Sequence, residues 1–158
     1  MHWRPLTICA FATLLAACGE GTSVRRNIAQ QVTRGEGEIL VMRQAAPFSW
    51  SRLYVFPPYS SPGRIEQTLG FSWSGARRSV IKVSDEINLL VFVEGKRVVE
   101  SVELPRSSGD FYKAYRPQGF ARDSAQFVVR REEIKRSILP GAGSDTTGGS
   151  HWVLYPVR

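Results

Sequence analysis

Serine, histidine and carboxylate side chains are the residues from which this chain could build a hydrolytic site, and their spacing argues against one. Ser150 directly precedes His151. Adjacent residues of a strand point to opposite faces, so this pair is poorly placed for proton transfer. The segment Gly70-Phe71-Ser72-Trp73-Ser74 misses the nucleophile-elbow pattern at its last position, where serine stands in place of glycine. We therefore predict no catalytic triad.

Other reactive combinations also lack the spacing that their chemistry requires. Glu132-Glu133 lies in a stretch expected to be helical, where adjacent side chains diverge, whereas a glycosidase needs opposed carboxylates about 5–9 Å apart. The loop Gly141-Ala142-Gly143-Ser144-Asp145-Thr146 lacks both the third glycine of a dinucleotide loop and the lysine of a P-loop. The acids Asp85-Glu86 and Asp110 have no calcium-loop spacing. We expect no catalytic residue, no bound metal and no cofactor, and thus not an enzyme.

Cys18 ends an apolar N-terminal run and is the residue best placed for covalent chemistry. A short basic segment, residues 1–5, precedes twelve uncharged residues, Leu6–Ala17. This build is typical of a secretory signal peptide, since a membrane-spanning helix needs about 20 residues. The sequence Leu15-Ala16-Ala17-Cys18 resembles the lipobox of bacterial lipoproteins at all four positions. The resemblance implies cleavage before Cys18, diacylation of its sulfur and acylation of its new amine.

The same resemblance implies a cellular location. Gly19 follows the cysteine, and in Gram-negative lipoproteins a residue other than aspartate here implies transfer to the outer membrane. Two or three acyl chains hold a protein firmly, whereas one holds it only marginally. We expect a lipid anchor at the periplasmic face of the outer membrane. The alternatives are an ordinary cleavable signal with a chance cysteine, or an anchor at Cys9, which Ile8 disfavours.

The remaining composition limits the chemistry further. Removal of residues 1–17 lowers the formal net charge from +7 to +6 and leaves one cysteine, used by the lipid, and one histidine, His151. That inventory excludes an internal disulfide and a Cys/His zinc site. Arg25, Arg26 and Arg34 favour either attraction to anionic headgroups or a solvated arginine-rich surface. The export signal disfavours nucleic acid as a partner.

The chain divides into three predicted parts: a signal peptide (1–17), a flexible tether (18–35) and one domain (36–158). The tether is predicted because residues 19–35 hold several glycines and few large apolar side chains. The domain is long enough for one substantial core. Its patterning predicts an α+β fold with a mainly antiparallel sheet of about six strands and one or two short helices.

Alternation of apolar residues places the strands, and capping residues place the helices. Strands are predicted at residues 38–43, 50–56, 77–83, 87–93, 97–104, 125–130 and 152–155. One helix follows Ser61 as its cap and ends at Gly70, and a second covers residues 131–139. Glu94-Gly95-Lys96 predicts a tight turn, residues 107–122 are expected to be irregular, and residues 140–150 to be a glycine-rich loop.

Aromatic residues concentrate between Phe48 and Trp73. The strand Trp50–Phe56, the helix ending Leu69-Gly70-Phe71 and the strand Ile87–Val93 together resemble a group of small uncharacterised bacterial lipoproteins. This resemblance covers residues 48–105. It implies a shared fold unit and a location in the cell envelope. A further likeness is to the small lipoprotein subunit of the outer-membrane β-barrel assembly machinery, where a short capped helix also ends in Leu-Gly. This chain differs in helix length and lacks the acidic helix start.

Tyr59, Phe71 and Trp73 are the candidate binding residues. All three lie in turns that flank one helix of about eight residues, or ~12 Å, so they could share an edge. Exposed aromatics of this kind concentrate the energy of protein interfaces, although core packing is the alternative, as expected for Tyr54 and Phe56. We expect a non-enzymatic module that binds a protein or envelope component. The alternatives are an immunity-type inhibitor of a secreted toxin and an accessory lipoprotein in outer-membrane assembly.

Overall fold

The computed structural model describes residues 19–133 and 149–157, which form an α+β fold with two antiparallel sheets. The helices are α1 (Glu20–Val32), α2 (Met42–Ala45), α3 (Pro62–Leu69) and α4 (Ser74–Arg78). The strands are β1 (Ile39–Val41), β2 (Arg52–Phe56), β3 (Ile87–Glu94), β4 (Arg97–Pro105), β5 (Phe120–Ala121), β6 (Gln126–Glu133) and β7 (Ser150–Pro156). Three short 3-10 turns are η1 (Val80–Lys82), η2 (Arg106–Ser108) and η3 (Tyr112–Ala114).

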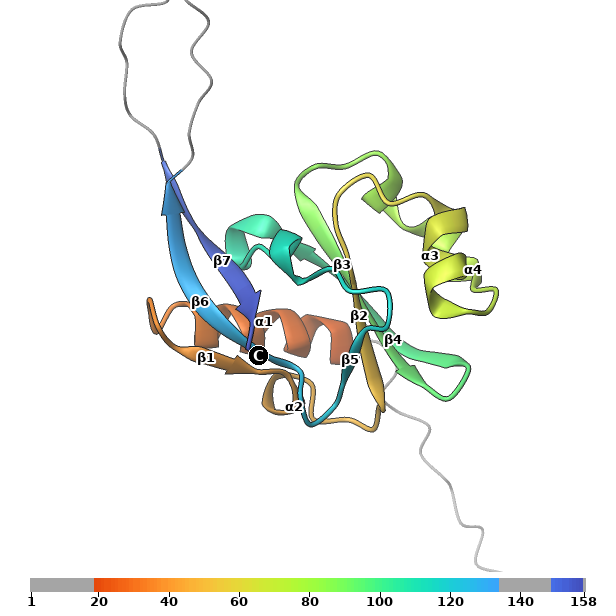
Figure 1. Cartoon of the computed structure of the whole chain (residues 1–158), viewed down its shortest axis with the longest axis horizontal. Coiled ribbons are helices and arrows are strands. Elements are labelled where there is room, and N and C mark those ends of the chain that lie inside the picture. Colours follow the sequence, from red (N-terminus) through yellow and green to blue (C-terminus); the bar gives the residue numbers. More distant parts are fainter. Residues whose placement is uncertain (1–18, 134–148, 158) are drawn as a thin grey trace, which may run out of the picture.

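The larger sheet has the strand order β4-β3-β2-β5 and the smaller has β1-β6-β7, as Figure 1 shows. A first core lies between α1, the smaller sheet and one face of the larger sheet; Ile28, Leu53 and Phe127 belong to it. A second core lies between the other face of the larger sheet and α3 and α4; Phe56 and Ile65 belong to it. The larger sheet is therefore covered on both faces, as the apolar residues on both sides of β2 predict.

Residues 20–32 form helix α1, so the prediction of a flexible tether over residues 18–35 is wrong there. Val24, Ile28 and Val32 lie four residues apart on one helical face and are buried in the first core. Burial of each such side chain stabilises the fold by about 1.5–3 kcal/mol, which outweighs the weak helix propensity of the surrounding glycine and threonine. The folded domain accordingly begins before residue 36.

Helix α3 agrees with its prediction at both ends. The Ser61 hydroxyl accepts the backbone N–H of Arg64 at 3.3 Å, and Pro62 stands at the first helical position. Gly70 ends the helix with a φ of 78°, in the left-handed region that glycine enters without cost. The tight turn between β3 and β4 is also confirmed, because Gly95 has a φ of 60° there.

Two predicted elements are wrong. Residues 77–83 form the end of α4 and the turn η1 rather than a strand, and only Ile81 of this stretch's large apolar residues is buried. Residues 131–133 continue strand β6 instead of starting a helix, because they pair with Ser150–Trp152 of β7. Tertiary pairing overrides the helical spacing in this stretch. The rest of that predicted helix, and most of the predicted glycine-rich loop, lie outside the described residues.

Candidate functional site

The predicted lipid site is covalently next to α1. Cys18 itself lies outside the described residues, and only Gly19 separates it from the first residue of α1. Helix α1 runs parallel to β4: a Cβ on Gly21 would lie 3.8 Å from the Ser101 carbonyl oxygen, and Gly109 lies beside Val32 and Ile28. The start of α1 therefore points to the end of the larger sheet at which β3 turns into β4.

Three exposed apolar side chains gather at the opposite end of the larger sheet, and we call them the apolar end. They are Tyr59, Val80 and Val83, with exposed fractions of 62%, 49% and 72%. The Tyr59 N–H donates to the Ile81 carbonyl oxygen at 2.8 Å, so the loop after β2 lies against η1. Figure 1 shows these two loops side by side above the larger sheet.

Tyr59 occupies its position at a conformational cost. Its φ is 61°, and it has the one positive φ among the described residues other than glycine. A left-handed conformation costs a bulky residue about 1–3 kcal/mol, and such strain clusters at functional sites. An exposed aromatic held in a strained turn, beside two exposed valines, is typical of a contact surface.

Phe71 and Trp73, the other two predicted contact residues, do not join the apolar end. Both are half-buried and pack against the second core. The Trp73 indole lies directly over Gly75, where an added Cβ would come within 2.1 Å of the ring. Trp73 is therefore fixed at the start of α4, and of the three predicted contact residues only Tyr59 is exposed.

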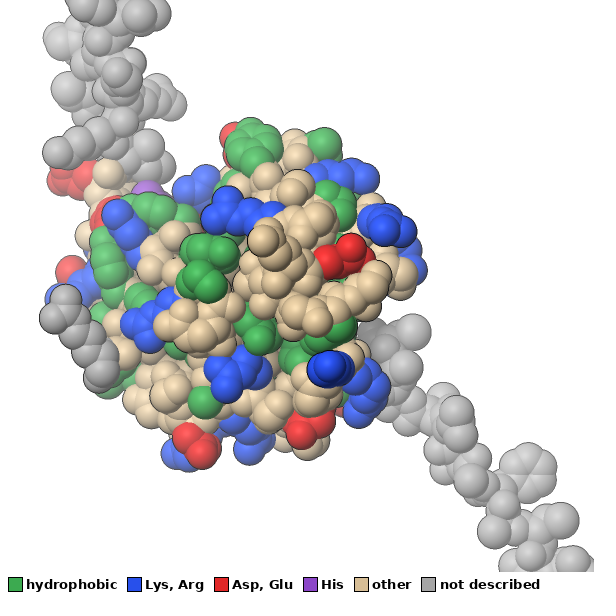
Figure 2. All heavy atoms as spheres, turned by 45° about the vertical axis from the view of Figure 1, so that its right-hand side comes forward, with side chains coloured by type: hydrophobic (Ala, Val, Ile, Leu, Met, Phe, Trp, Pro, Cys, Tyr) green, Lys and Arg blue, Asp and Glu red, His purple; other side chains and the backbone are tan. Residues whose placement is uncertain are grey.

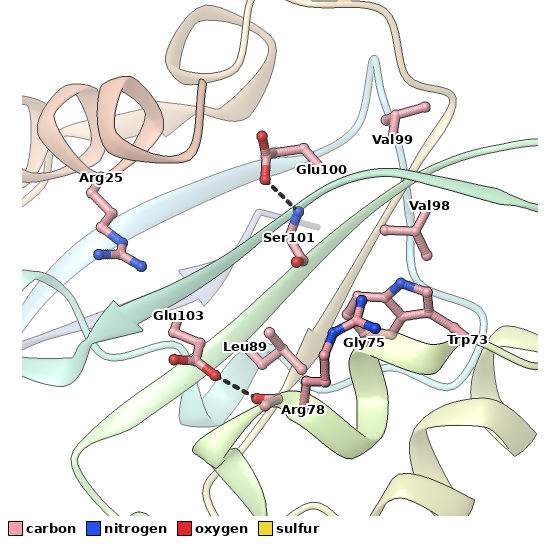
Figure 3. A pocket seen from close by; sticks show the side chains of 11 residues that line it. Arg25, Trp73, Gly75, Arg78, Leu89, Val98, Val99, Glu100, Ser101 and Glu103 are labelled. Atoms are coloured by element: carbon pink, nitrogen blue, oxygen red, sulfur yellow. Dashed lines mark hydrogen bonds between the residues drawn. The ribbon is translucent and has the colours of Figure 1, made fainter. Parts of the chain in front are cut away.

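Trp73 instead lines a groove of about 520 Å³ that runs along β4. Figure 3 shows Arg25 extending from α1 toward this groove, and Trp73 and Arg78 facing it from α4. The two carboxylates that line the groove, those of Glu100 and Glu103, already accept hydrogen bonds from neighbouring residues. Glu103 accepts the Ser79 hydroxyl at 2.7 Å, and Glu100 accepts the Ser101 N–H at 2.8 Å.

The outer edge of β4 is covered at Ser101. The Glu100 carboxylate covers the Ser101 N–H, and the first turn of α1 lies against the Ser101 carbonyl. Pro105, at the end of the strand, has no N–H to offer. Side-chain caps and proline are the usual protection of an edge strand against further pairing. Ser101 and Pro105 are therefore unavailable for pairing with an extended peptide in the groove.

A polar cluster around Asp110 was missed by the sequence reading. The fully buried Asp110 carboxylate accepts Arg106 Nε at 2.8 Å, the Tyr112 N–H at 3.0 Å and Asn88 Nδ2 at 3.3 Å. The hydrogen bond from Arg106 to Asp110 raises the pKa of Arg106. The backbone of Asp110 also bonds to Trp152 and Leu154 of β7. Asp110 thus joins η2 and η3 to both sheets.

Glu132 forms a second polar junction, between β6, β7 and η3. Its carboxylate accepts hydroxyl hydrogen bonds from Tyr155 and, at 2.8 Å, from Tyr112. These hydrogen bonds lower the pKa of Glu132. Burial, followed by the bond to Glu132, raises the pKa of Tyr112 to about 12. The pattern is that of a structural network that favours a charged carboxylate and neutral phenols.

The serine and histidine residues considered for a hydrolytic site contact other groups. The Ser150 hydroxyl accepts Arg131 Nε at 2.7 Å, and the Ser72 hydroxyl donates to Glu66. His151 Nε2 lies 3.6 Å from Asp110, and within residues 19–133 and 149–157 no serine bonds to its ring. Those residues contain no cluster of three or more potential metal ligands among His, Cys, Asp and Glu. They also contain no helix long and apolar enough to span a membrane.

Comparison with known proteins gives no relative. No family model matches the chain, and neither the curated proteins nor the solved structures contain a match. A functional interpretation therefore depends on the chain's own residues.

Proposed function

We propose that this protein is a lipid-anchored module of a bacterial envelope, fixed through Cys18 to the periplasmic face of the outer membrane, that binds a protein partner. The lipobox-like residues 15–18 and Gly19 support the anchor and its address. The apolar end supports the binding role. No cofactor and no catalytic step form part of this proposal.

One observation carries the binding role: Tyr59, Val80 and Val83 are exposed together at the end of the larger sheet remote from the start of α1. Strand β2 begins at Arg52, which pairs with Val93 next to the β3–β4 turn. It ends at Phe56, just before the loop that contains Tyr59. The apolar end and the start of α1 therefore lie at opposite ends of one sheet. This arrangement presents an apolar contact surface away from the lipid.

Aromatic and aliphatic side chains of this kind give much of the energy of protein interfaces, where truncation of an anchor often costs at least about 2 kcal/mol. Lys82 and Asp85 are exposed near Val83 in the sequence and supply a polar rim on that side. Figure 2 shows Lys and Arg side chains interspersed with hydrophobic ones over one face of the molecule. A patch of apolar residues with such a rim is typical of a protein-binding surface.

Site-specific photo-crosslinking in intact cells tests this function. We expect a photoreactive residue at Tyr59 or Val83 to give an adduct with an envelope protein. The matched control is Ile39, an exposed β1 residue with an exposed fraction of 49%, which should give none. Loss of the adduct in Val80→Ser would identify the apolar end as the surface involved. An adduct at Ile39 alone would contradict the proposed binding role. So would a lipidated protein that gives no adduct at any of these positions.

A further inference from the structure

We propose that the end of the molecule at which α1 begins rests on phospholipid headgroups, so that the bilayer holds the domain in one orientation. We call this the anchor end: residues 19–23 of α1 and the β3–β4 turn, Glu94–Arg97. The inference rests on the proposed lipid at Cys18. It adds a membrane-contact surface and a fixed direction for the apolar end.

The first step is the reach of the anchor. One residue spans at most about 3.6 Å, and only Gly19 lies between Cys18 and Glu20. The lipidated residue is thus within ~7 Å of the folded domain. A flexible tether over residues 18–35 would instead span ~23 Å on average. Because Val24 and Ile28 fix α1 in the first core, the folded domain begins two residues after Cys18.

The second step identifies the surface that this short reach brings to the bilayer. Gly21 lies beside Ser101 of β4, and α1 runs parallel to β4 from there. The β3–β4 turn precedes Ser101 by a few residues of extended chain, so it projects past the start of the helix. Figure 1 shows the turn and the start of α1 in the lower right part of the molecule, and the Tyr59 loop at its top.

The third step is the charge of the anchor end. Lys96 and Arg97 of the β3–β4 turn are exposed, and neither makes an ion pair within the described residues. Their long side chains reach outward to phosphate groups, whose attraction decays over about 8 Å at physiological salt. Glu20 and Glu94 balance these two charges, so the anchor end as a whole carries no formal net charge. The covalent reach therefore sets the proximity, and Lys96 and Arg97 are the side chains of the turn that can contact headgroup phosphates.

Fluorescence quenching in vesicles tests the orientation. The full-length chain is expressed with its signal, purified with its lipid, and reconstituted into vesicles of phosphatidylethanolamine and phosphatidylglycerol that contain a headgroup-labelled quencher. A fluorophore is placed on Lys96→Cys or, as the matched control, on Val83→Cys. We expect strong quenching at position 96 and little at position 83. Equal quenching at the two positions would overturn the proposed orientation.

A linker variant separates orientation from anchoring. A Gly-Ser insertion of about fifteen residues between Gly19 and Glu20 adds ~20 Å of flexible chain and keeps the lipobox and Gly19 unchanged. We expect the variant to remain membrane-bound and to lose most of the quenching at position 96; quenching retained at position 96 would contradict the role of the short reach. Mass spectrometry of the purified chain reports the lipid separately. A chain without lipid would remove the proposed anchor, whereas a lipidated chain with equal quenching would remove the orientation alone.

Discussion

Helices α1 and α3 cover opposite faces of the larger sheet, and different forces hold them. Helix α3 is specified locally: Ser61 caps its first turn, Pro62 presets its first position and Gly70 ends it. Helix α1 has no side-chain cap at its start and depends on Val24, Ile28 and Val32 in the first core. A helix of the first kind can be recognised from its own residues. A helix of the second kind exists only because the rest of the fold covers one of its faces.

The largest expected effect tests the packing of α1. Ile28→Ala deletes a fully buried side chain of the first core, and such truncations cost about 2–5 kcal/mol. Chemical denaturation of the soluble chain, starting at Gly19, measures the loss. Gln30→Ala is the matched control, because Gln30 is an exposed residue of the same helix and should change stability little. Equal effects of the two substitutions would mean that residues 20–32 behave as a tether after all.

A smaller effect is expected from the junction on which α1 packs. Gly109 touches α1, and the neighbouring Asp110 is held by Arg106, Asn88 and Tyr112. Asp110→Asn removes the charge that Arg106 pairs with. Breaking a fully buried pair costs about 3–5 kcal/mol, but Arg106 has an exposed side-chain fraction of 36%, so we expect about 2 kcal/mol. Denaturant unfolding measures it, with the exposed Asp123→Asn as the control. A loss no larger than that of the control would show that the junction is not stabilising.

The contrast between the helices also explains what the sequence could reveal. The α+β class, β2, α3, β3 and the β3–β4 turn depend on local signals and could be predicted. Helix α1 has only three large apolar residues among polar side chains and one glycine, so its sequence resembles that of a linker. Asp110 and His151 meet through a long-range contact that sequence spacing does not reveal.

The apolar end, too, could not be predicted as a whole from the sequence, because long-range contacts assemble it. The sequence predicts Tyr59 as a contact residue from its place in a turn beside a short helix, whereas Val80 and Val83 fall within the strand predicted at residues 77–83. Both are β-branched, which favours a strand, and nothing local shows that the chain turns there. The Ser79 hydroxyl bonds to the Ile81 N–H and to Glu103 of β4, and these contacts impose the turn η1. A contact surface assembled from such turns can be located only in the folded molecule.

Removal of the Ser61 cap of α3 should reduce the stability of the fold moderately. Ser61→Ala removes the hydroxyl that accepts the Arg64 N–H, and loss of an N-cap costs about 1 kcal/mol. Ser61→Asp retains an acceptor at the cap and should preserve stability. Thermal unfolding of the two variants measures the difference. If both variants lose the same stability, the cap does not hold α3 and the contrast with α1 disappears.

The smallest effect is expected where α3 meets α4. Glu66 accepts the Trp73 N–H at 3.0 Å and the Ser72 hydroxyl at 2.9 Å, and these bonds, the first more than the second, lower its pKa from the usual 4.5. The folded state therefore binds this proton more weakly than the unfolded chain does. Its contribution to stability is present above about pH 4.5 and is lost as the pH falls through the lowered pKa.

We expect Glu66→Gln to reduce the difference in Tm between about pH 6 and about pH 3. Glu36→Gln is the control, because Glu36 is exposed and should leave that difference unchanged. An unchanged difference in Glu66→Gln would mean that the carboxylate does not link α3 to Trp73, so the position of that indole over Gly75 would depend on packing alone.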